Sequence, residues 1–118
     1  HNMVEVKIGG KKRKFSYGLE AIGWVQVEAG IDLTNPREGL NETSLFYILI
    51  KYIILLGNKW ELKKEGKQID YNYDDVEDWI KETGVMGKEV ITIWNEFNES
   101  ISSYMPQQEE VDDKPKKK

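Results

Sequence analysis

Along residues 4–17, apolar and charged side chains alternate, which is the period of β-strands with one buried face. The alternation is interrupted at Gly9-Gly10, a pair that readily adopts the positive φ angles of a tight hairpin turn. We therefore expect a short N-terminal β-hairpin whose inner face carries Val4, Val6, Ile8 and Phe15. Because two strands alone are marginally stable in water, this hairpin must pack against helices or against a partner.

From Gly18 onwards the apolar residues recur at steps of three and four, the period of helices with one buried face. Capping and stop signals predict four helices, from Gly18 to Gly30, from about residue 42 to Leu56, from Asp74 to Gly84 and from about Lys88 to Tyr104. The expected N-caps are Asn41 or Thr43 for the second helix and Asp74, in a capping box with Glu77, for the third.

Three of these helices have clear inner faces. In the first helix the face comprises Leu19, Ala21, Ile22, Trp24, Val25 and Ala29. In the third it comprises Val76, Trp79, Ile80 and Thr83. In the fourth it comprises Val90, Ile93, Trp94, Phe97 and Ile101.

The second predicted helix differs from the others because residues 45–56 leave almost no polar face, with Lys51 as the single break. Its β-branched residues also suit a buried strand, but the length between the capping signal and the stop at Gly57-Asn58 favours a helix. A helix that is apolar all round is either enclosed by the fold or docked against a partner. The polar, lysine-rich stretch from Lys59 to Tyr73 is expected to be a loop.

These elements predict a mainly α fold, a compact bundle of about four helices with an N-terminal β-hairpin, in a single domain over residues 3–105. The chain has 118 residues, of which 39% are hydrophobic and 32% charged, an ordinary balance for one globular domain. His1-Asn2 reads as the leftover of an expression tag before a start at Met3. Residues 106–118 are highly polar and are expected to be a disordered charged tail.

The side chains that usually carry catalysis are scarce in this chain. There is no cysteine, and the single histidine is His1, so the commonest general base and metal ligands are missing from the native sequence. The acidic stretch 70–78 lacks the spacing of a calcium loop, and Gly9-Gly10-Lys11-Lys12 lacks that of a phosphate loop. We expect no enzyme activity, no cofactor and no metal. The longest apolar run, 45–56, is shorter than the roughly 20 residues of a membrane span, so we expect a soluble protein.

The formal net charge is -4, yet residues 1–17 carry an excess of cations. The basic run from Lys11 to Lys14 is typical of surfaces that bind nucleic acid. Such a run is more often the solvated end of a hairpin, where lysines also discourage unwanted strand pairing. The acidic remainder of the chain disfavours nonspecific nucleic-acid binding, which needs cations to replace phosphate counterions. We do not expect a nucleic-acid partner, and a small nucleic-acid-binding regulator is kept as an alternative function.

The order of the elements matches a known pattern. A basic hairpin runs into a helix (MVEVKIGGKKRKFSYGLEAIGWVQVEAGIDLT), a very hydrophobic helix follows (SLFYILIKYIILLG), and the segments DDVEDWIKE and IWNEFNESI come later. In this order, over about residues 3–105, the chain resembles the tail assembly chaperones of long-tailed (siphovirus-type) bacteriophages and prophages of Gram-positive bacteria. The likeness lies in element order and scattered positions rather than in a short diagnostic motif.

The resemblance implies a function in protein binding. Such proteins bind the long, helical, hydrophobic tape-measure protein, keep it soluble and help to recruit tail-tube subunits. They act in the bacterial host cytoplasm and are absent from the mature virion. A longer form is often made by ribosomal frameshifting, and AAA codons for Lys116 to Lys118 would suit that process. A structural head-tail connector is the second alternative function.

The partner-binding surface is expected on the second helix and next on the fourth. The candidate contact residues are Phe46, Tyr47, Ile50, Ile54, Trp94 and Phe97. All six also suit a core, which is the competing interpretation of these positions. Trp60 and Tyr71 fall in the predicted loop and are further candidates for exposed anchors. Apolar helices often close on a second copy, so a homo-oligomer is a further expectation.

Overall fold

The computed structural model describes residues 3–31 and 41–105, which form a two-stranded antiparallel sheet followed by four helices. The elements are β1 (Val4–Ile8), β2 (Lys11–Phe15), α1 (Leu19–Ala29), α2 (Glu42–Lys64), α3 (Tyr73–Thr83) and α4 (Lys88–Tyr104). The predicted mainly α fold with an N-terminal hairpin is confirmed. The predicted tag remnant at residues 1–2 and the predicted tail at residues 106–118 lie outside the described residues.

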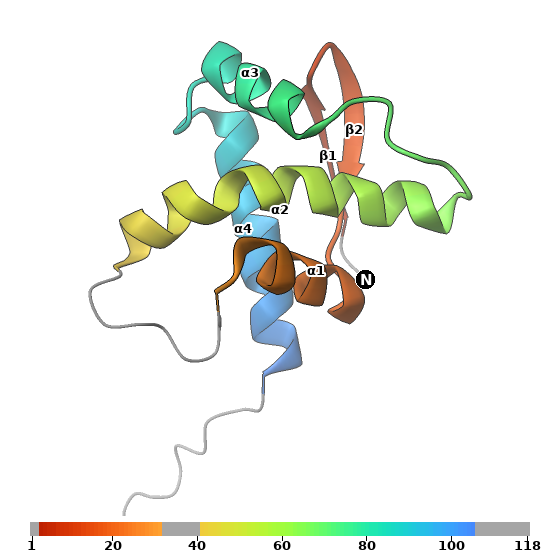
Figure 1. Ribbon diagram of the computed structural model, residues 1–118. Helices are drawn as coiled ribbons and strands as arrows, with labels where there is room; N and C mark the ends of the chain where they lie inside the picture. The colour runs from red at the N-terminus through yellow and green to blue at the C-terminus, as the bar shows by residue number, and fades with distance from the viewer. Residues whose placement is uncertain (1–2, 32–40, 106–118) are drawn as a thin grey trace, which may run out of the picture.

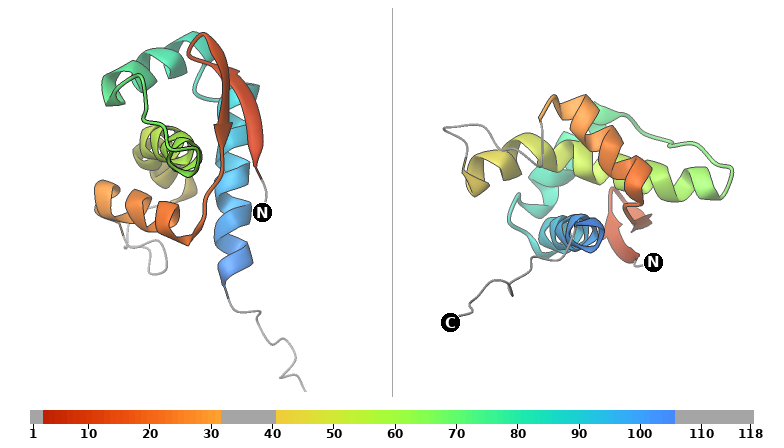
Figure 2. Two further views of the ribbon diagram at one scale, coloured as in Figure 1. Left: turned by 90° about the vertical axis from the view of Figure 1, so that its right-hand side faces the viewer. Right: turned by 90° about the horizontal axis from the view of Figure 1, so that it is seen from below.

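The long helix α2 is the centre of the arrangement (Figure 1). Helices α1 and α3 pack against it from opposite sides, α4 crosses it, and β2 lies against it as well. Strand β1 packs on α4, and Figure 2 shows the hairpin and α4 together on one side of α2. The core between these elements includes Phe15, Tyr17, Ile53, Ile54, Val76, Val90, Ile93 and Phe97.

The hairpin has the register that its two-residue turn imposes. Gly9 and Gly10 have φ angles of 66° and 88°, the pair of positive values that a type I′ turn needs. The predicted inner-face residues are buried, except for Val4, which is half-buried. Cross-strand partners on this face are Val4 and Phe15, Val6 and Arg13, and Ile8 and Lys11.

Arg13 is buried on the inner face of β2, with 8% of its surface exposed, although it lies in a run of basic residues. Its guanidinium donates hydrogen bonds to the carbonyl oxygens of Ile8 (2.9 Å) and Gly9 (2.9 Å) and to a carboxylate oxygen of Asp70 (3.2 Å). Lys11 forms a second ion pair with Asp70 (3.0 Å). The hydrogen bonds from Lys11 and Arg13 hold the pKa of Asp70 below its ordinary value. The charge of Arg13 is therefore satisfied inside the fold.

Two aromatic rings flank the Arg13 guanidinium. Its central carbon lies 4.3 Å from the ring centroid of Trp79 and 4.9 Å from that of Tyr71. Trp79 belongs to α3, and Tyr71 lies in the segment just before it. Since cation–π contacts with a delocalised guanidinium are favourable, this cluster ties the turn of the hairpin to α3.

The predicted end of the second helix at Gly57-Asn58 is wrong, because α2 continues without a break to Lys64. Gly57 lies against Tyr17, and a side chain at this position would overlap the Tyr17 ring. Asn58 donates a hydrogen bond to the Lys14 carbonyl oxygen (2.9 Å). Both apparent helix breakers are thus contact residues, and tertiary packing overrides their low helix propensity.

The predicted loop from Lys59 to Tyr73 is consequently helical over its first part. Trp60 lies on α2 and is half-buried, with its ring centroid 5.8 Å from that of Trp24 in an edge-to-face contact. Glu61 is buried, accepts a hydrogen bond from the Ser16 hydroxyl and pairs with Lys64 (2.8 Å). These contacts join the C-terminal half of α2 to α1 and to the segment after β2.

The cap of α3 also differs from the predicted one. Asn72 is the N-cap, and its side chain accepts a hydrogen bond from the Asp75 N–H (3.0 Å). Asp75 in turn accepts one from the Asn72 N–H (2.9 Å), which completes a capping box. The predicted pair of Asp74 and Glu77 is therefore wrong, because the N-cap lies two residues earlier in the chain. Of the two caps predicted for α2, Asn41 and Thr43, the structure has Asn41.

On α1 the inner face is narrower than predicted. Ala21 and Val25 are fully buried, whereas Leu19 is 63% exposed and was assigned to the inner face wrongly. Leu19 is the first residue of the helix, where the spacing of apolar residues does not reveal how far the core extends. Val27 is also exposed, at 77%.

The substitutions Gly57→Ala and Gly23→Ala place the same methyl group inside two helices, and we expect opposite effects. Helix propensity alone favours alanine by up to about 1 kcal/mol at each site. Around Gly23 no atom lies within 4 Å of the added group, so the gain should appear. At Gly57 the methyl group overlaps Tyr17, and the free energy of unfolding should fall by about 1–3 kcal/mol. Urea unfolding measures both, and a stabilised Gly57→Ala variant would contradict the close approach.

The substitution Arg13→Lys should lower the free energy of unfolding by about 2 kcal/mol or more, although it keeps the charge. A lysine cannot reproduce the planar fork that bonds two carbonyls and one carboxylate between two rings. The matched control is Lys12→Arg, since Lys12 is exposed on the same strand and its change should stay within about 0.5 kcal/mol. Urea unfolding of both variants tests this difference, and equal stabilities would show that the Arg13 cluster is unimportant.

Candidate protein-binding groove

An open groove of about 570 Å³ lies between the first turns of α2 and the outer side of α4. Most of its lining is apolar, and the one charged residue among the described lining residues is Glu42. The apolar lining residues of the two helices are Leu45, Phe46, Tyr47 and Leu49 of α2 and Ile91, Trp94, Phe97 and Ile101 of α4.

Aromatic rings form the floor of this groove. Phe46 is 7% exposed, and its ring meets that of Trp94 edge to face, with 4.8 Å between the centroids. Phe97 is 1% exposed and meets Tyr17 of the core in the same way at 5.1 Å. Edge-to-face contacts hold rings in defined orientations, so the floor is formed before any partner arrives.

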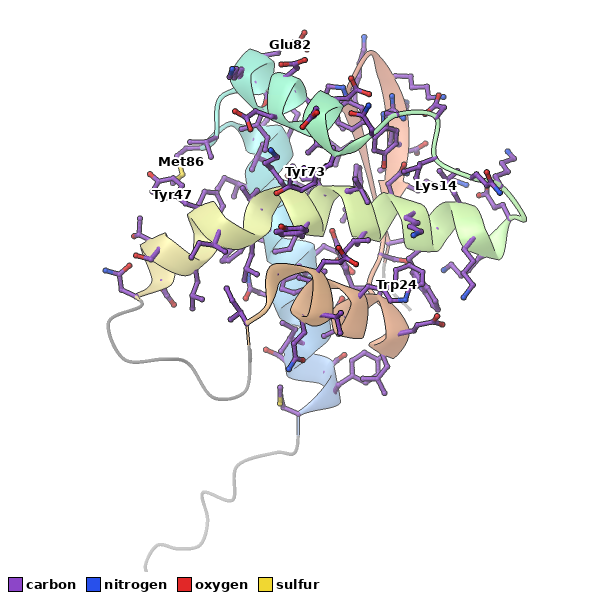
Figure 3. The ribbon with its side chains drawn as sticks, in the orientation of Figure 1. Lys14, Trp24, Tyr47, Tyr73, Glu82 and Met86 are labelled. Carbon is purple, nitrogen blue, oxygen red and sulfur yellow. The ribbon has the colours of Figure 1, made fainter. Side chains whose placement is uncertain are left out.

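Two exposed apolar side chains, Tyr47 and Met86, lie at one end of the groove and form its rim (Figure 3). Tyr47 is 57% exposed and Met86 is 66% exposed. An exposed tyrosine combines apolar area with a polar tip, and methionine adapts its shape to varied contacts. Both residue types are therefore suited to contact with another protein.

The backbone of the turn between α3 and α4 sets the position of Met86. Gly84 ends α3 with a φ of 88°, and the Gly87 N–H donates a hydrogen bond to the Gly84 carbonyl (2.9 Å). A side chain at Gly87 would collide with the carbonyl oxygen of Thr83. The turn is therefore tight, and Met86 is left exposed within it.

The N-terminal end of α2 is defined by its cap. The Asn41 side chain accepts a hydrogen bond from the Ser44 N–H (2.8 Å), which satisfies a backbone donor of the first turn. The turns that follow reach beyond α3 and α1 (Figure 1). Since α4 covers one side of them, Phe46 and Leu49 are buried while Tyr47 and Ile48 remain exposed.

The structure brings together at this groove four of the six residues predicted as partner contacts, namely Phe46, Tyr47, Trp94 and Phe97. The other two, Ile50 and Ile54, are 3% and 0% exposed, belong to the core and do not line the groove. Sequence reasoning missed Met86. The available signal was an apolar residue in a turn bounded by two glycines.

Three of the four residues in the basic run of the hairpin are buried or paired with acids, and the fourth, Lys12, is exposed. Arg13 is buried, Lys11 pairs with Asp70, and Lys14 pairs with Glu65 (3.3 Å). A hollow of about 370 Å³ beside the hairpin contains these ion pairs, so Lys11, Arg13 and Lys14 in its lining already have acidic partners. Exposed ion pairs of this kind add little stability, but they lower the local excess of positive charge.

Trp60 and Tyr71, considered above as exposed anchors, both pack within the fold. Trp60 is half-buried against Trp24. Tyr71 donates a hydrogen bond to Asn58 (2.7 Å) and packs on Trp79 with 4.5 Å between ring centroids. Burial raises the pKa of the Tyr71 hydroxyl, which keeps it a neutral donor. These two residues therefore stabilise the domain.

Within residues 3–31 and 41–105, no three His, Cys, Asp or Glu side chains lie close enough together to hold a metal ion. In the same part of the chain, no helix has the length and apolar character needed to cross a membrane. Comparisons with protein-family models, with curated proteins and with solved structures find no match to this chain.

The groove residues divide into exposed rim residues and buried floor residues, and the free energy of unfolding of substituted variants should distinguish the two groups. Tyr47→Glu and Met86→Glu change exposed side chains and should alter the free energy of unfolding by no more than about 0.5 kcal/mol. Phe97→Ala empties a fully buried site and should cost about 3–5 kcal/mol. Thermal or urea unfolding gives the comparison. A large loss of stability in the two rim variants would place these side chains in the core.

Proposed function

We propose that this chain is a phage tail assembly chaperone that holds an amphipathic helical segment of the tape-measure protein in the groove between α2 and α4. The observation that carries the proposal is an apolar groove with exposed Tyr47 and Met86 on a chain in which 32% of the residues are charged. Apolar patches rimmed by polar surface mark protein interaction sites. The resemblance in element order supports the choice of partner.

The groove suits a helix with one apolar face. Its two walls are helices, and its floor offers rings and aliphatic side chains along both of them. A helix laid in such a groove inserts side chains at steps of three and four residues. Apolar contacts tolerate variation in sequence, which a protein needs if it binds successive segments of a long helical partner. The rim residues Tyr47 and Met86 can adapt to each segment.

Binding of this kind would keep the partner soluble. Each bound segment hides its apolar face from water, while the charged exterior of the domain faces the solvent. Recruitment of tail-tube subunits would follow once the tape-measure protein is held in solution. The chain acts in the host cytoplasm by binding alone in this proposal, without a catalytic step, and it leaves before the virion is complete.

The two alternative functions differ from this proposal in what they require. A nucleic-acid-binding regulator would need an open basic surface, and Arg13, Lys11 and Lys14 are buried or paired. A head-tail connector would keep its partner permanently and would be found in purified particles. The groove fits reversible binding of a helical segment better than either.

Co-expression with the tape-measure protein of the same genome tests the proposal. The tape-measure protein should be soluble only when this chain is present, and the two should elute together in size-exclusion chromatography. Tyr47→Glu and Met86→Glu place a charge at the rim, and each should lower the amount that co-purifies by roughly tenfold.

The matched control is Val27→Glu. Val27 is an apolar residue more exposed than either rim residue, but it lies on α1 and does not line the groove, so this variant should bind normally. If the tape-measure protein stays insoluble beside the unaltered chain, the chaperone function is wrong. If all three variants retain full binding, the function stands but the groove is not its site.

A further inference from the structure

Strand β1 has an outer edge whose backbone groups point away from the hairpin. In an antiparallel pair, alternate residues direct their N–H and C=O groups toward the partner strand. The two-residue turn makes Ile8 and Lys11 a hydrogen-bonded pair, so every second residue of β1, counted back from Ile8, bonds to β2. The backbone groups of the intervening residues, Glu5 and Lys7, therefore point outward.

The two edges of the hairpin differ in what covers them. On the β2 side, Asn58 of α2 donates a hydrogen bond to the Lys14 carbonyl (2.9 Å), in agreement with the alternation, since Lys14 lies opposite Glu5. On the β1 side, no backbone hydrogen bond from another described element reaches Glu5 or Lys7. In the left view of Figure 2, β1 is the outermost element of this side of the molecule. This edge is free to accept a strand.

The sequence of β1, VEVKI, is complementary to itself when reversed. If two copies run antiparallel with Val6 opposite Val6, Glu5 of each copy lies opposite Lys7 of the other. The same register makes Glu5 and Lys7 the hydrogen-bonded pairs, as their outward backbone groups require. Shifting this register by two residues would place Glu5 opposite Glu5 or Lys7 opposite Lys7, which is unfavourable because like charges repel. Shifting it by one residue would place the apolar face of one copy beside the charged face of the other.

We propose that a second copy of this chain pairs with the β1 edge in that register. The product is a four-stranded antiparallel sheet with the order β2, β1, β1 and β2, and with a twofold axis at Val6. Opposite charges meet on its exposed face, and the apolar side chains Val4, Val6 and Ile8 of both copies continue on its inner face. A four-stranded sheet packed on helices is more stable than an isolated hairpin, and the twofold contact closes on itself without forming a fibre.

The dimer leaves the binding groove free, because no residue of β1 lines it. Each dimer therefore carries two grooves. A long partner with repeated apolar segments would occupy both, and the second contact would form at a high effective concentration. Pairing through β1 does not depend on the chaperone function, and each can be tested without the other.

Sedimentation velocity of the full chain over a wide concentration series tests the pairing. The unaltered protein should shift from monomer to dimer as its concentration rises. Glu5→Lys and Lys7→Glu each replace two attractive pairs with two like-charge pairs, so the dissociation constant of the dimer should rise at least about tenfold. The double variant E5K/K7E restores opposite charges in every pair and should dimerise nearly as the unaltered chain does.

The matched control is Lys12→Glu, which changes the net charge as Lys7→Glu does but lies on β2, away from the partner strand. Its dimerisation should be unchanged. Glu5, Lys7 and Lys12 are all exposed, so the variants should fold, and urea unfolding verifies this. A chain that stays monomeric throughout the series would overturn the proposal. A dimer that is insensitive to both single reversals would overturn it as well.

Discussion

The fold depends on the close approach of α2 to the segment that follows β2. Gly57 leaves room for the ring of Tyr17, whose hydroxyl donates a hydrogen bond to the Ile53 carbonyl (2.5 Å). Burial raises the pKa of this hydroxyl well above its ordinary value, so it remains a neutral donor. The same approach lets Asn58 bond to the carbonyl of Lys14 on β2. One position without a side chain thus joins the longest helix to the hairpin.

This contact also explains why a groove exists. The hairpin packs on the C-terminal half of α2, and the first turns of the helix extend along α4 beyond α1 and α3. Tyr17 meets Phe97, and Phe46 meets Trp94, so the floor of the groove continues the packing of the core. Tyr47, at the rim, and Ile48 are the exposed apolar residues on this end of α2. Binding at the rim therefore needs no opening of the domain.

The charged residues of the hairpin have different roles because successive residues of a strand point to opposite faces. Arg13 points inward and joins the turn to α3, while Lys14 on the other face pairs with Glu65. Glu5 and Lys7 point outward beside an open edge and are the residues of the proposed dimer contact. A run that reads as one basic patch in the sequence is divided in space into a structural part and a surface part.

The hairpin, α1 and α4 could be predicted from the sequence because alternation, turn glycines and three-four spacing are properties of neighbouring residues. The same spacing placed Phe46 and Trp94 among the candidate groove residues, but it could not separate rim from core. The passage of α2 through Gly57, the burial of Arg13 and the place of Met86 at the rim depend on contacts between residues far apart in the chain. The spacing of neighbouring residues does not indicate such contacts, because they form only when the helices and the hairpin pack together.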